Sequence, residues 1–355
     1  MAIKEHFGNQ ALQKWDDKKA VARDPSALEK YRILLAEQIQ YFKVTQYFFF
    51  KQWTELKNYA NQKGIQIIGD MPIYVAADSV EVWTKPELFQ LDEERNPLFV
   101  AGVPADQFSA TGQLWGNPLY AWEEHKKQGY AWWIHRIEES FKIYDVLRID
   151  HFKGFSDYWQ VDGKAEVAKD GSWQPGPGYD LFKAVKEQLG DLPIIAEDLG
   201  NIDDKARKLL TDCNYPGMKI LQFGFEDVSG ESLDSPHYCI PHSIVYTGTH
   251  DNDVTNGWYN SLTEQQQQYI NDYTHRHEDE SICQAMIRQL FATVSNTAIA
   301  TMQDVLDLPA SSRMNVPSTI GGNWQWRMQQ SDLTQDKKDF LEKMTTLYQR
   351  ANQEK

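Results

Sequence analysis

The chain has 355 residues, of which 41% are hydrophobic and 25% charged, as is typical of a folded globular protein. Its formal net charge of -15 argues against binding to nucleic acid or to an anionic membrane surface, since both need a basic footprint. No apolar run approaches the roughly 20 residues of a membrane span, and residues 1–10 lack the apolar stretch of a signal peptide. These features favour a cytoplasmic protein with a neutral substrate.

In chain order, the first expected elements are helical. Ser26 is predicted to cap a helix over 27–42, and a second helix over 44–63 is predicted to end at Gly64. Residues 65–70 form a short apolar run that ends in a carboxylate, which is typical of a strand followed by a functional loop. We therefore expect residues 1–63 to form a helical region that precedes the first strand.

Residues 64–355 are expected to form the catalytic part of the chain. The stretch 72–128 is rich in Pro, Gly, Asn and aromatic residues and too long for a simple connection, so it is predicted to be an inserted lid or subdomain. Strand and helix then alternate. The predicted strands cover 146–150, 192–196, 218–225, 243–249 and 298–302. The predicted helices cover 181–189, capped by Asp180, 203–211, 263–276, with a Thr263/Gln266 capping box, 282–294 and 332–353.

Alternating strands and helices predict a parallel sheet, either doubly wound or closed into a barrel. Polar clusters repeatedly follow the apolar strands, at Asp70, 148–151, 197–198 and 250–253. In a barrel all of these strand ends face one mouth, where the active site is built, so the pattern favours the barrel. No dinucleotide-binding, phosphate-loop or serine-hydrolase motif is present.

Two carboxylates at the ends of consecutive predicted strands, Asp150 and Glu197, fit the acid/base and nucleophile pair of a glycosidase. Arg148 lies two residues before Asp150, on the same side of the strand, where its charge would keep Asp150 ionised. The alternatives are that these carboxylates cap the following helices and that Arg148 and Asp150 form a packing salt bridge. The 12 Trp are consistent either with core packing or with platforms for the apolar faces of sugars.

Five segments resemble the amylomaltase family, the 4-α-glucanotransferase branch of the α-amylase clan. They are 69–75 (GDMPIYV), 102–118, 147–152 (LRIDHF), 195–200 (IAEDLG) and 247–252 (TGTHDN). The resemblance implies a (β/α)8 TIM barrel with Asp150 as nucleophile, Glu197 as acid/base and Asp251 as a third carboxylate. It implies that the substrate-binding residues are Asp70, Asp106, Phe108, Gln113, Trp115, Asn117, Arg148, His151, Asp198, His250, Asn252 and Asn315. A core role is the alternative for His250.

The resemblance implies retaining transfer of α-1,4-glucan segments to the 4-hydroxyl of glucose or a maltooligosaccharide. The expected substrates are maltooligosaccharides, amylose or glycogen-derived glucans and glucose. Neither a metal nor another cofactor is expected, and Cys213, Cys239 and Cys283 are too widely spaced to suggest a metal site or a disulfide framework. Hydrolysis by the same residues and glucan binding without turnover remain open alternatives.

The chain departs from the family pattern before residue 40. The family has a longer N-terminal region with the first two barrel strands and a glycine- and tyrosine-rich loop, which are not recognisable here. The expected fold is therefore an incomplete barrel of six strands with unpaired edges, an arrangement that favours self-association or an N-terminal fragment as partner. Weak or absent activity is expected unless a partner supplies the first strands.

Overall fold

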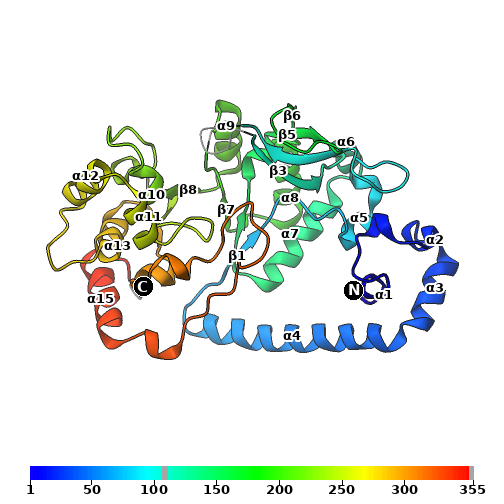
Figure 1. Cartoon of the computed structure of the whole chain (residues 1–355), viewed down its shortest axis with the longest axis horizontal. Coiled ribbons are helices and arrows are strands. Elements are labelled where there is room, and N and C mark those ends of the chain that lie inside the picture. The colour runs from blue at the N-terminus through cyan, green and yellow to red at the C-terminus, as the bar shows by residue number, and fades with distance from the viewer. Residues whose placement is uncertain (106–110, 201, 352–355) are drawn as a thin grey trace. The chain divides into compact units, whose positions relative to one another are not determined.

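The computed structural model describes residues 1–105, 111–200 and 202–351. The chain divides into two compact units, Met1–Tyr215 (unit 1) and Pro216–Lys355 (unit 2). Each unit contains a three-stranded parallel sheet and a hydrophobic core (Figure 1). Alternating parallel strands and helices confirm the predicted α/β class.

The parallel sheet of unit 1 has the order β1-β4-β7, with β1 at Ile68–Met71, β4 at Val146–Ile149 and β7 at Ile194–Ala196. Helix α7 (Ala131–Ile143) leads into β4, and α8 (Tyr179–Leu189) lies between β4 and β7 in the chain. The three strands are short, and each is followed directly by polar residues. The pairing register of these strands determines which of the polar residues lie next to one another.

The N-terminal helices of unit 1 correct two predictions. Asp24, and not Ser26, caps α3 (Pro25–Leu34), because its side chain accepts hydrogen bonds from the backbone N–H groups of Ser26 and Ala27. Proline at the first helical position, with its fixed φ, favours a helix that begins there. Helix α4 (Ala36–Gln62) follows, so the predicted break between helices at residue 43 is wrong and the break lies at Leu35. Gly64, with a φ of 73°, lies just beyond the end of α4, as predicted. The first two helices are α1 (Ala2–His6) and α2 (Lys18–Val21).

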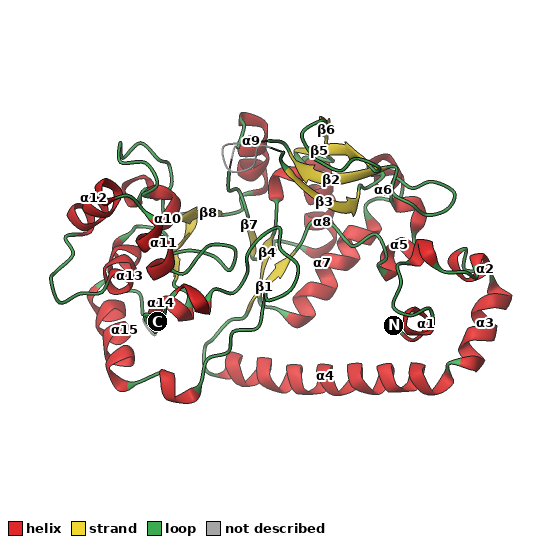
Figure 2. Ribbon diagram, in the orientation of Figure 1, coloured by secondary structure: helices red, strands yellow, loops and turns green. Residues whose placement is uncertain are grey.

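A four-stranded antiparallel sheet, in the order β3-β2-β5-β6, lies beside the parallel sheet in unit 1 (Figure 2). The stretch 72–128 supplies β2 (Phe99–Val103) and β3 (Gln113–Pro118), together with the short helices α5 (Val80–Thr84) and α6 (Trp122–Lys127). The other two strands, β5 (Asp157–Asp162) and β6 (Ser172–Pro175), come from the loop after β4 and were not predicted. The inserted region is therefore joined by strand pairing to the chain that follows β4.

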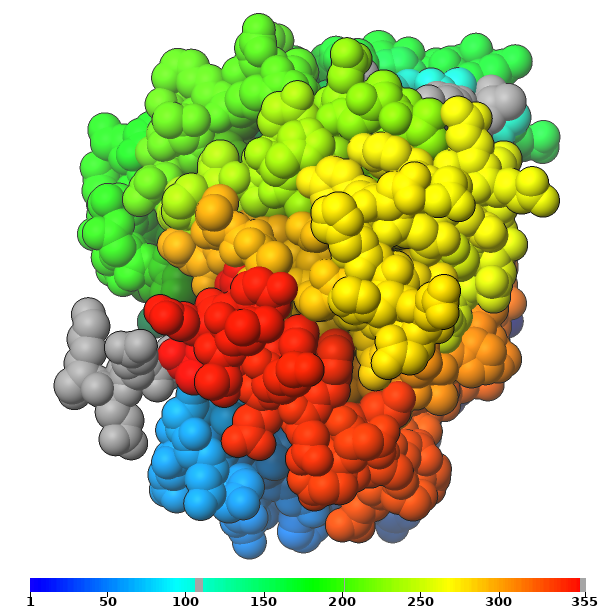
Figure 3. Space-filling model, turned by 90° about the vertical axis from the view of Figure 1, so that its left-hand side faces the viewer, coloured from blue at the N-terminus to red at the C-terminus, as the bar shows by residue number. Residues whose placement is uncertain are grey.

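Unit 2 has the strand order β10-β9-β8, with β8 at Gly217–Ile220, β9 at Ser243–Tyr246 and β10 at Thr297–Ile299. The predicted strand over 218–225 is half wrong, because Leu221–Gly224 forms the short helix α10. The predicted Thr263/Gln266 capping box is present at α12. The remaining helices are α9 (Asp204–Cys213), in unit 1, and α11 (Thr255–Ser261), α12 (Glu264–Thr274), α13 (Ile282–Ala292), α14 (Met302–Val305) and α15 (Gln335–Leu347), in unit 2. Figure 3 shows α12 in yellow and α15 in red on the surface of unit 2.

The strands are held by aromatic and aliphatic packing within each unit. In unit 1 Trp133, Phe152 and Phe155 are at most 1% exposed and pack with the buried residues of β4. In unit 2 Val245 of β9 packs with Met286 and Leu290 of α13, all fully buried.

Helix α8 begins after Gly178, so the predicted cap at Asp180 is wrong by two residues. In the described part of the chain, no helix is both long and apolar enough to cross a membrane.

Candidate active site

The carboxyl ends of β1, β4 and β7 place Asp70, Asp150 and Glu197 on three neighbouring strands. Asp70 on β1 pairs in register with Arg148 on β4, and Ile149 on β4 pairs with Ala196 on β7. Asp150 and Glu197 are the next residues after Ile149 and Ala196. The backbone N–H of Glu197 donates to the Ile149 carbonyl at 3.0 Å. Adjacent strands lie about 4.8 Å apart, so this register brings the two predicted catalytic residues to adjoining strand ends.

Arg148 lies between two of these carboxylates. Its Nη1 donates to both oxygens of Asp70, at 2.6 and 2.7 Å, and to Oδ1 of Asp150 at 2.9 Å. Burial by itself would lower the pKa of Arg148, but the charges of Asp70 and Asp150 outweigh it and raise the pKa above its usual range. The guanidinium is therefore a permanent cation that stabilises the negative charge of Asp150, while Asp70 orients the guanidinium.

Glu197 has the opposite electrostatic environment. Burial is the main cause that raises its pKa, and the neighbouring charge of Asp150 adds to it. Arg148 and two backbone N–H donors, His151 and Leu199, each 2.8 Å from the carboxyl, counteract this only in part. The resulting pKa of about 7 means that Glu197 can hold a proton and release it near neutral pH.

His151 connects this cluster to the antiparallel sheet. Its φ of 51° is uncommon for a residue other than glycine, and its backbone N–H donates to Oε2 of Glu197. Burial lowers the pKa of the His151 ring to about 4, so the ring is neutral at pH 7. Trp115 meets that ring edge to face, with 4.8 Å between the ring centroids.

Three predicted substrate residues alternate along β3, so Gln113, Trp115 and Asn117 share one face of the strand. The Trp115 indole N–H donates to Oε1 of Gln113 at 3.2 Å, and Asn117 donates to the Val75 carbonyl at 2.9 Å. Trp115 is 36% exposed, which leaves part of its ring available to a ligand. Asp106 and Phe108, also predicted, lie outside the described residues, and Asp198 is a partly buried residue next to Glu197.

The predicted residues of unit 2 gather after β9. Nε2 of His250 lies 3.2 Å from Oδ2 of Asp251, and the side-chain amide of Asn315 donates to Oδ1 of Asp251 at 2.6 Å. Oδ1 of Asn252 accepts from the backbone and hydroxyl of Thr249, both at 2.9 Å, and so closes the turn that presents Asp251. His250 is not a core residue, since its side chain is 31% exposed.

Two further contacts fix this turn, and sequence reasoning assigned a role to neither. Asp304, 2% exposed, accepts from the hydroxyl of Thr247 at 2.6 Å and from the backbone of Thr255 at 2.8 Å. Nη2 of Arg313 donates to the Asp251 carbonyl at 2.7 Å. Arg313 lies two residues before Asn315, which the family resemblance did indicate, and that proximity is the sequence signal that could have identified Arg313.

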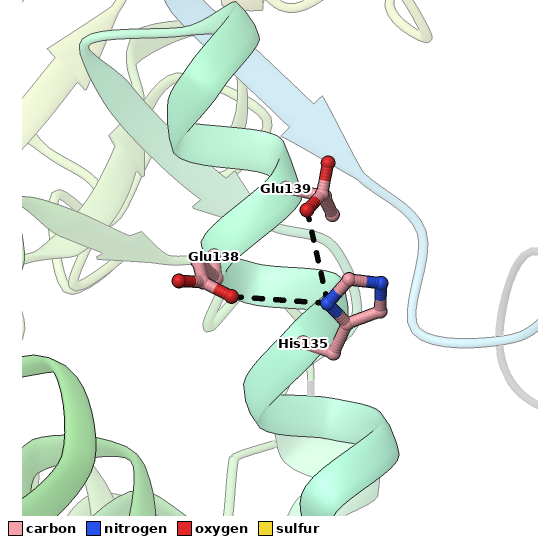
Figure 4. Close-up of side chains that lie close together, drawn as sticks. All are labelled: His135, Glu138 and Glu139. Carbon is pink, nitrogen blue, oxygen red and sulfur yellow. Dashed lines mark ion pairs between the residues drawn. The ribbon is translucent and has the colours of Figure 1, made fainter.

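A separate group of potential metal ligands, His135, Glu138 and Glu139, lies on the exposed surface of α7 (Figure 4). Nδ1 of His135 lies 3.7 Å from an oxygen of each glutamate, and Glu139 also pairs with Lys142. Spacings of three and four residues place these side chains on one helix face, as in ordinary surface ion pairs. The strand-end chemistry does not involve them.

Comparison with known proteins agrees with this geometry. The family model described as 4-alpha-glucanotransferase matches residues 1–334. The chain belongs to this family. It is 53% identical over 354 residues to the 4-alpha-glucanotransferase of Streptococcus pneumoniae serotype 4, and the match covers 99% of this chain and 70% of the relative. The relative from Clostridium butyricum is 42% identical over 355 residues, with 99% and 72% covered.

The solved structure titled amylomaltase from Streptococcus agalactiae in complex with acarbose matches with a TM-score of 0.97. That match has 60% sequence identity and covers 99% of this chain and 71% of the solved chain. It confirms the predicted family and the predicted α/β barrel class of fold, of which each unit here supplies three parallel strands that alternate with helices. Members of this family are enzymes of the glycosyltransferase type.

Proposed function

We propose that the chain transfers segments of α-1,4-glucan to the 4-hydroxyl of glucose or a maltooligosaccharide, with retention of the α configuration. One observation carries this proposal, namely the contrast between Asp150 and Glu197 on adjacent strands. Asp150 lies 2.9 Å from the permanent cation of Arg148, whereas burial raises the pKa of Glu197 to about 7. A retaining mechanism needs one ionised and one protonated carboxyl group about 5–5.5 Å apart.

In the first step, protonated Glu197 donates its proton to the glycosidic oxygen while a carboxylate oxygen of Asp150 attacks the anomeric carbon. The bond to the leaving sugar breaks, and a glucosyl ester forms on Asp150. In the second step, ionised Glu197 removes the proton from the acceptor 4-hydroxyl, whose oxygen displaces Asp150. Two inversions at one carbon restore the original configuration. A pKa near 7 suits Glu197 for both directions of proton transfer.

Binding roles complete the proposal. Asp251 is proposed to hold sugar hydroxyls and to stabilise positive charge on the distorted ring, with His250, Asn252 and Asn315 around it. The other proposed contacts, on the strand ends and on the antiparallel sheet, are Asp70, Asp106, Phe108, Gln113, Trp115, Asn117, Arg148, His151 and Asp198.

Hydrolysis with water as final acceptor is the second candidate. Trp115 favours transfer, because its exposed ring beside His151 offers an apolar surface that suits a sugar acceptor better than water. Incubation with maltotriose followed by chromatography separates the candidates. Transfer yields glucose and chains longer than maltotriose, whereas hydrolysis yields only shorter products.

The matched control is the Asp150→Asn variant, which keeps the shape of the side chain. We expect it to lose transfer by roughly 10⁴-fold or more, as is typical when a nucleophile is removed. Activity near that of the wild type would remove Asp150 from the nucleophile role. Acarbose, bound by the similar Streptococcus agalactiae protein, serves as a competing ligand in the same assay.

We also propose that α4 is covered by a partner polypeptide. None of its 27 residues is buried, and the aromatic run Tyr47–Phe50 is between 47% and 64% exposed. Four consecutive residues span about 300° of a helix, so a single neighbouring helix cannot cover them all. Edge strand β1, which follows α4, favours a partner that adds strands and helices.

The occupant proposed is the part of the family fold that this chain does not match. The test mixes the chain with a polypeptide spanning the part of the Streptococcus agalactiae amylomaltase outside the matched 71%, and measures sedimentation. A one-to-one complex is expected, and a dimer of the chain alone that resists the added polypeptide would contradict the proposal.

A cytoplasmic location is also proposed, supported by the three free thiols.

A further inference from the structure

The loop 313–324 of unit 2 is built onto the segment that carries Asp251. Arg313 donates to the Asp251 carbonyl at 2.7 Å and to the Asn315 carbonyl at 2.8 Å. Asn315 in turn donates from its backbone to the His250 carbonyl at 3.2 Å and from its side chain to Asp251 at 2.6 Å. The start of the loop therefore has a fixed position relative to Asp251.

The end of the loop is fixed as well. The backbone N–H of Trp324 donates to the Met314 carbonyl at 2.7 Å, so the loop closes on its own beginning. Within it, Oδ1 of Asn323 accepts from the backbone of Val316 at 3.0 Å, and the Asn323 amide donates to the Thr319 hydroxyl at 3.0 Å. These hydrogen bonds hold the loop in one conformation without a hydrophobic core of its own.

Trp324 has two features that stability alone does not favour. Its φ is 62°, a left-handed conformation that is a genuine outlier for a bulky residue and is energetically unfavourable. Its side chain is nevertheless 54% exposed, so the conformation does not serve to bury the indole. Backbone strain of this kind is concentrated at ligand-binding and catalytic sites.

The position of the indole indicates what it could bind. Its ring centroid lies 5.1 Å from that of His250, with 43° between the planes, and His250 neighbours the Asp251 carboxylate. An exposed apolar ring beside a carboxylate, an imidazole and an amide matches the two kinds of surface on a glucosyl unit. Its C–H face packs on an aromatic ring, and its hydroxyls bond to polar groups.

We infer that Trp324 is a sugar-stacking residue, which packs on the apolar face of a glucosyl unit held by the polar groups around Asp251. This inference rests on the proposed function, because it takes an α-1,4-glucan as the ligand. The competing explanation is structural, namely that the indole only covers His250 and keeps the loop closed. The two explanations differ in what a change at Trp324 does to glucan affinity.

Trp173 provides a matched control. It is a second tryptophan of similar exposure, 44%, on β6 of unit 1. Lys153 Nζ lies 4.5 Å from the centroid of its ring, and Trp159 packs against it at 5.2 Å, so the face next to Lys153 is occupied. Removing Trp173 deletes an exposed indole without touching the loop 313–324.

The experiment measures maltoheptaose binding by calorimetry in the Asp150→Asn background, which prevents turnover. We expect Trp324→Ala to weaken binding about tenfold, since it removes an apolar contact of one sugar face. Trp324→Phe should retain most of the affinity but show a smaller change in tryptophan fluorescence on binding than the parent, because only the contribution of Trp324 is lost and that of Trp115 remains. Trp173→Ala should bind as the parent does.

Equal affinity of the parent and Trp324→Ala would overturn the inference, as would equal weakening by Trp324→Ala and Trp173→Ala. If Trp324→Ala does not fold, a fluorescence change in Trp324→Phe as large as that in the parent also overturns the inference. A parent that binds no maltoheptaose overturns the proposed function, and this subsite with it. If the parent and Trp324→Ala bind maltoheptaose equally well, the sugar-stacking role of Trp324 is overturned and the proposed function is not.

Discussion

The strand ends of unit 1 and unit 2 both present carboxylates, but the groups around those carboxylates differ. In unit 1, Asp150 shares the permanent cation of Arg148 with Asp70, and Glu197 is partly buried beside them with a raised pKa. In unit 2, Asp251 is surrounded by the amide of Asn315 and the imidazole of His250. One environment raises the pKa of one carboxyl group beside a permanent cation, and the other holds a single carboxylate between an amide and an imidazole.

This difference shows that a carboxylate at a strand end does not by itself define its chemistry. A carboxyl group becomes a proton donor at neutral pH only where burial or a like charge opposes its ionisation, as at Glu197. Amide and imidazole donors instead favour a carboxylate that binds and orients. The proposed division is therefore chemistry in unit 1 and binding in unit 2, and the substitutions below test that division.

The largest effect is expected at Glu197. Glu197→Gln keeps the shape of the side chain and one of the two oxygens that accept from the backbone N–H groups of His151 and Leu199, but it cannot donate a proton to the leaving oxygen. We expect the rate of transfer from maltotriose to fall by about 10⁴-fold, at the upper end for general acid–base catalysis. Formation of the glucosyl ester from α-maltosyl fluoride, whose leaving group needs no proton, should be nearly unaffected.

Rapid-quench measurement of fluoride release gives the control. If Glu197→Gln slows both donors equally, Glu197 does not act as the proton donor, and the contrast with Asp251 disappears. Asp150→Asn should abolish turnover of both donors, because it replaces the attacking carboxylate by an amide.

A smaller effect is expected at Asp251. Asp251→Asn preserves an oxygen for the Asn315 amide but removes the negative charge. We expect kcat to fall by about 10²–10³-fold with a modest change in KM, as when one electrostatic contact to a transition state is removed. The fluoride donor should not rescue this variant, since the missing charge acts on the sugar ring and not on the leaving group. Rescue would place Asp251 in proton transfer.

Several elements of both units could be predicted from the sequence for simple physical reasons. The runs 146–150 and 192–196 are short, apolar and bounded by polar residues, and β4 and β7 lie within them. The Thr263/Gln266 capping box is a local hydrogen-bond pattern, and it is present. Local patterns of this kind depend only on residues a few positions apart.

Features that depend on distant residues were missed. Strand β5 forms because β2, more than 50 residues earlier, offers a partner, as in the pairing of Ala101 with Gln160, and β6 in turn pairs with β5. The apolar run 218–225 splits into β8 and α10, and an apolar run alone does not distinguish strand from buried helix. At the site, the sequence indicated Asp150 and Glu197, whereas the pKa of about 7 arises from burial, which no motif encodes.

The smallest expected effect is on the pH dependence of the free energy of unfolding. It tests whether the surroundings of Glu197 disfavour its charged form as strongly as the raised pKa indicates. The pKa of Glu197 is raised from 4.5 to about 7 in the folded chain, so between these values the folded state holds a proton that the unfolded state has released. The free energy of unfolding therefore falls as pH rises from about 4.5 to 7, by up to about 3 kcal/mol from this group.

Glu197→Gln is never charged and should not show this loss. We expect the unfolding midpoint of the variant to exceed that of the wild type above pH 7, with the difference shrinking towards pH 4.5 in urea titrations. Asp251→Asn is the matched control from unit 2, and its difference from the wild type should not follow this pH course. If the difference for Glu197→Gln is constant from pH 4.5 to 8, the buried carboxyl is not the source of the pH dependence. The contrast between the two strand ends would then rest on hydrogen bonding rather than on proton affinity.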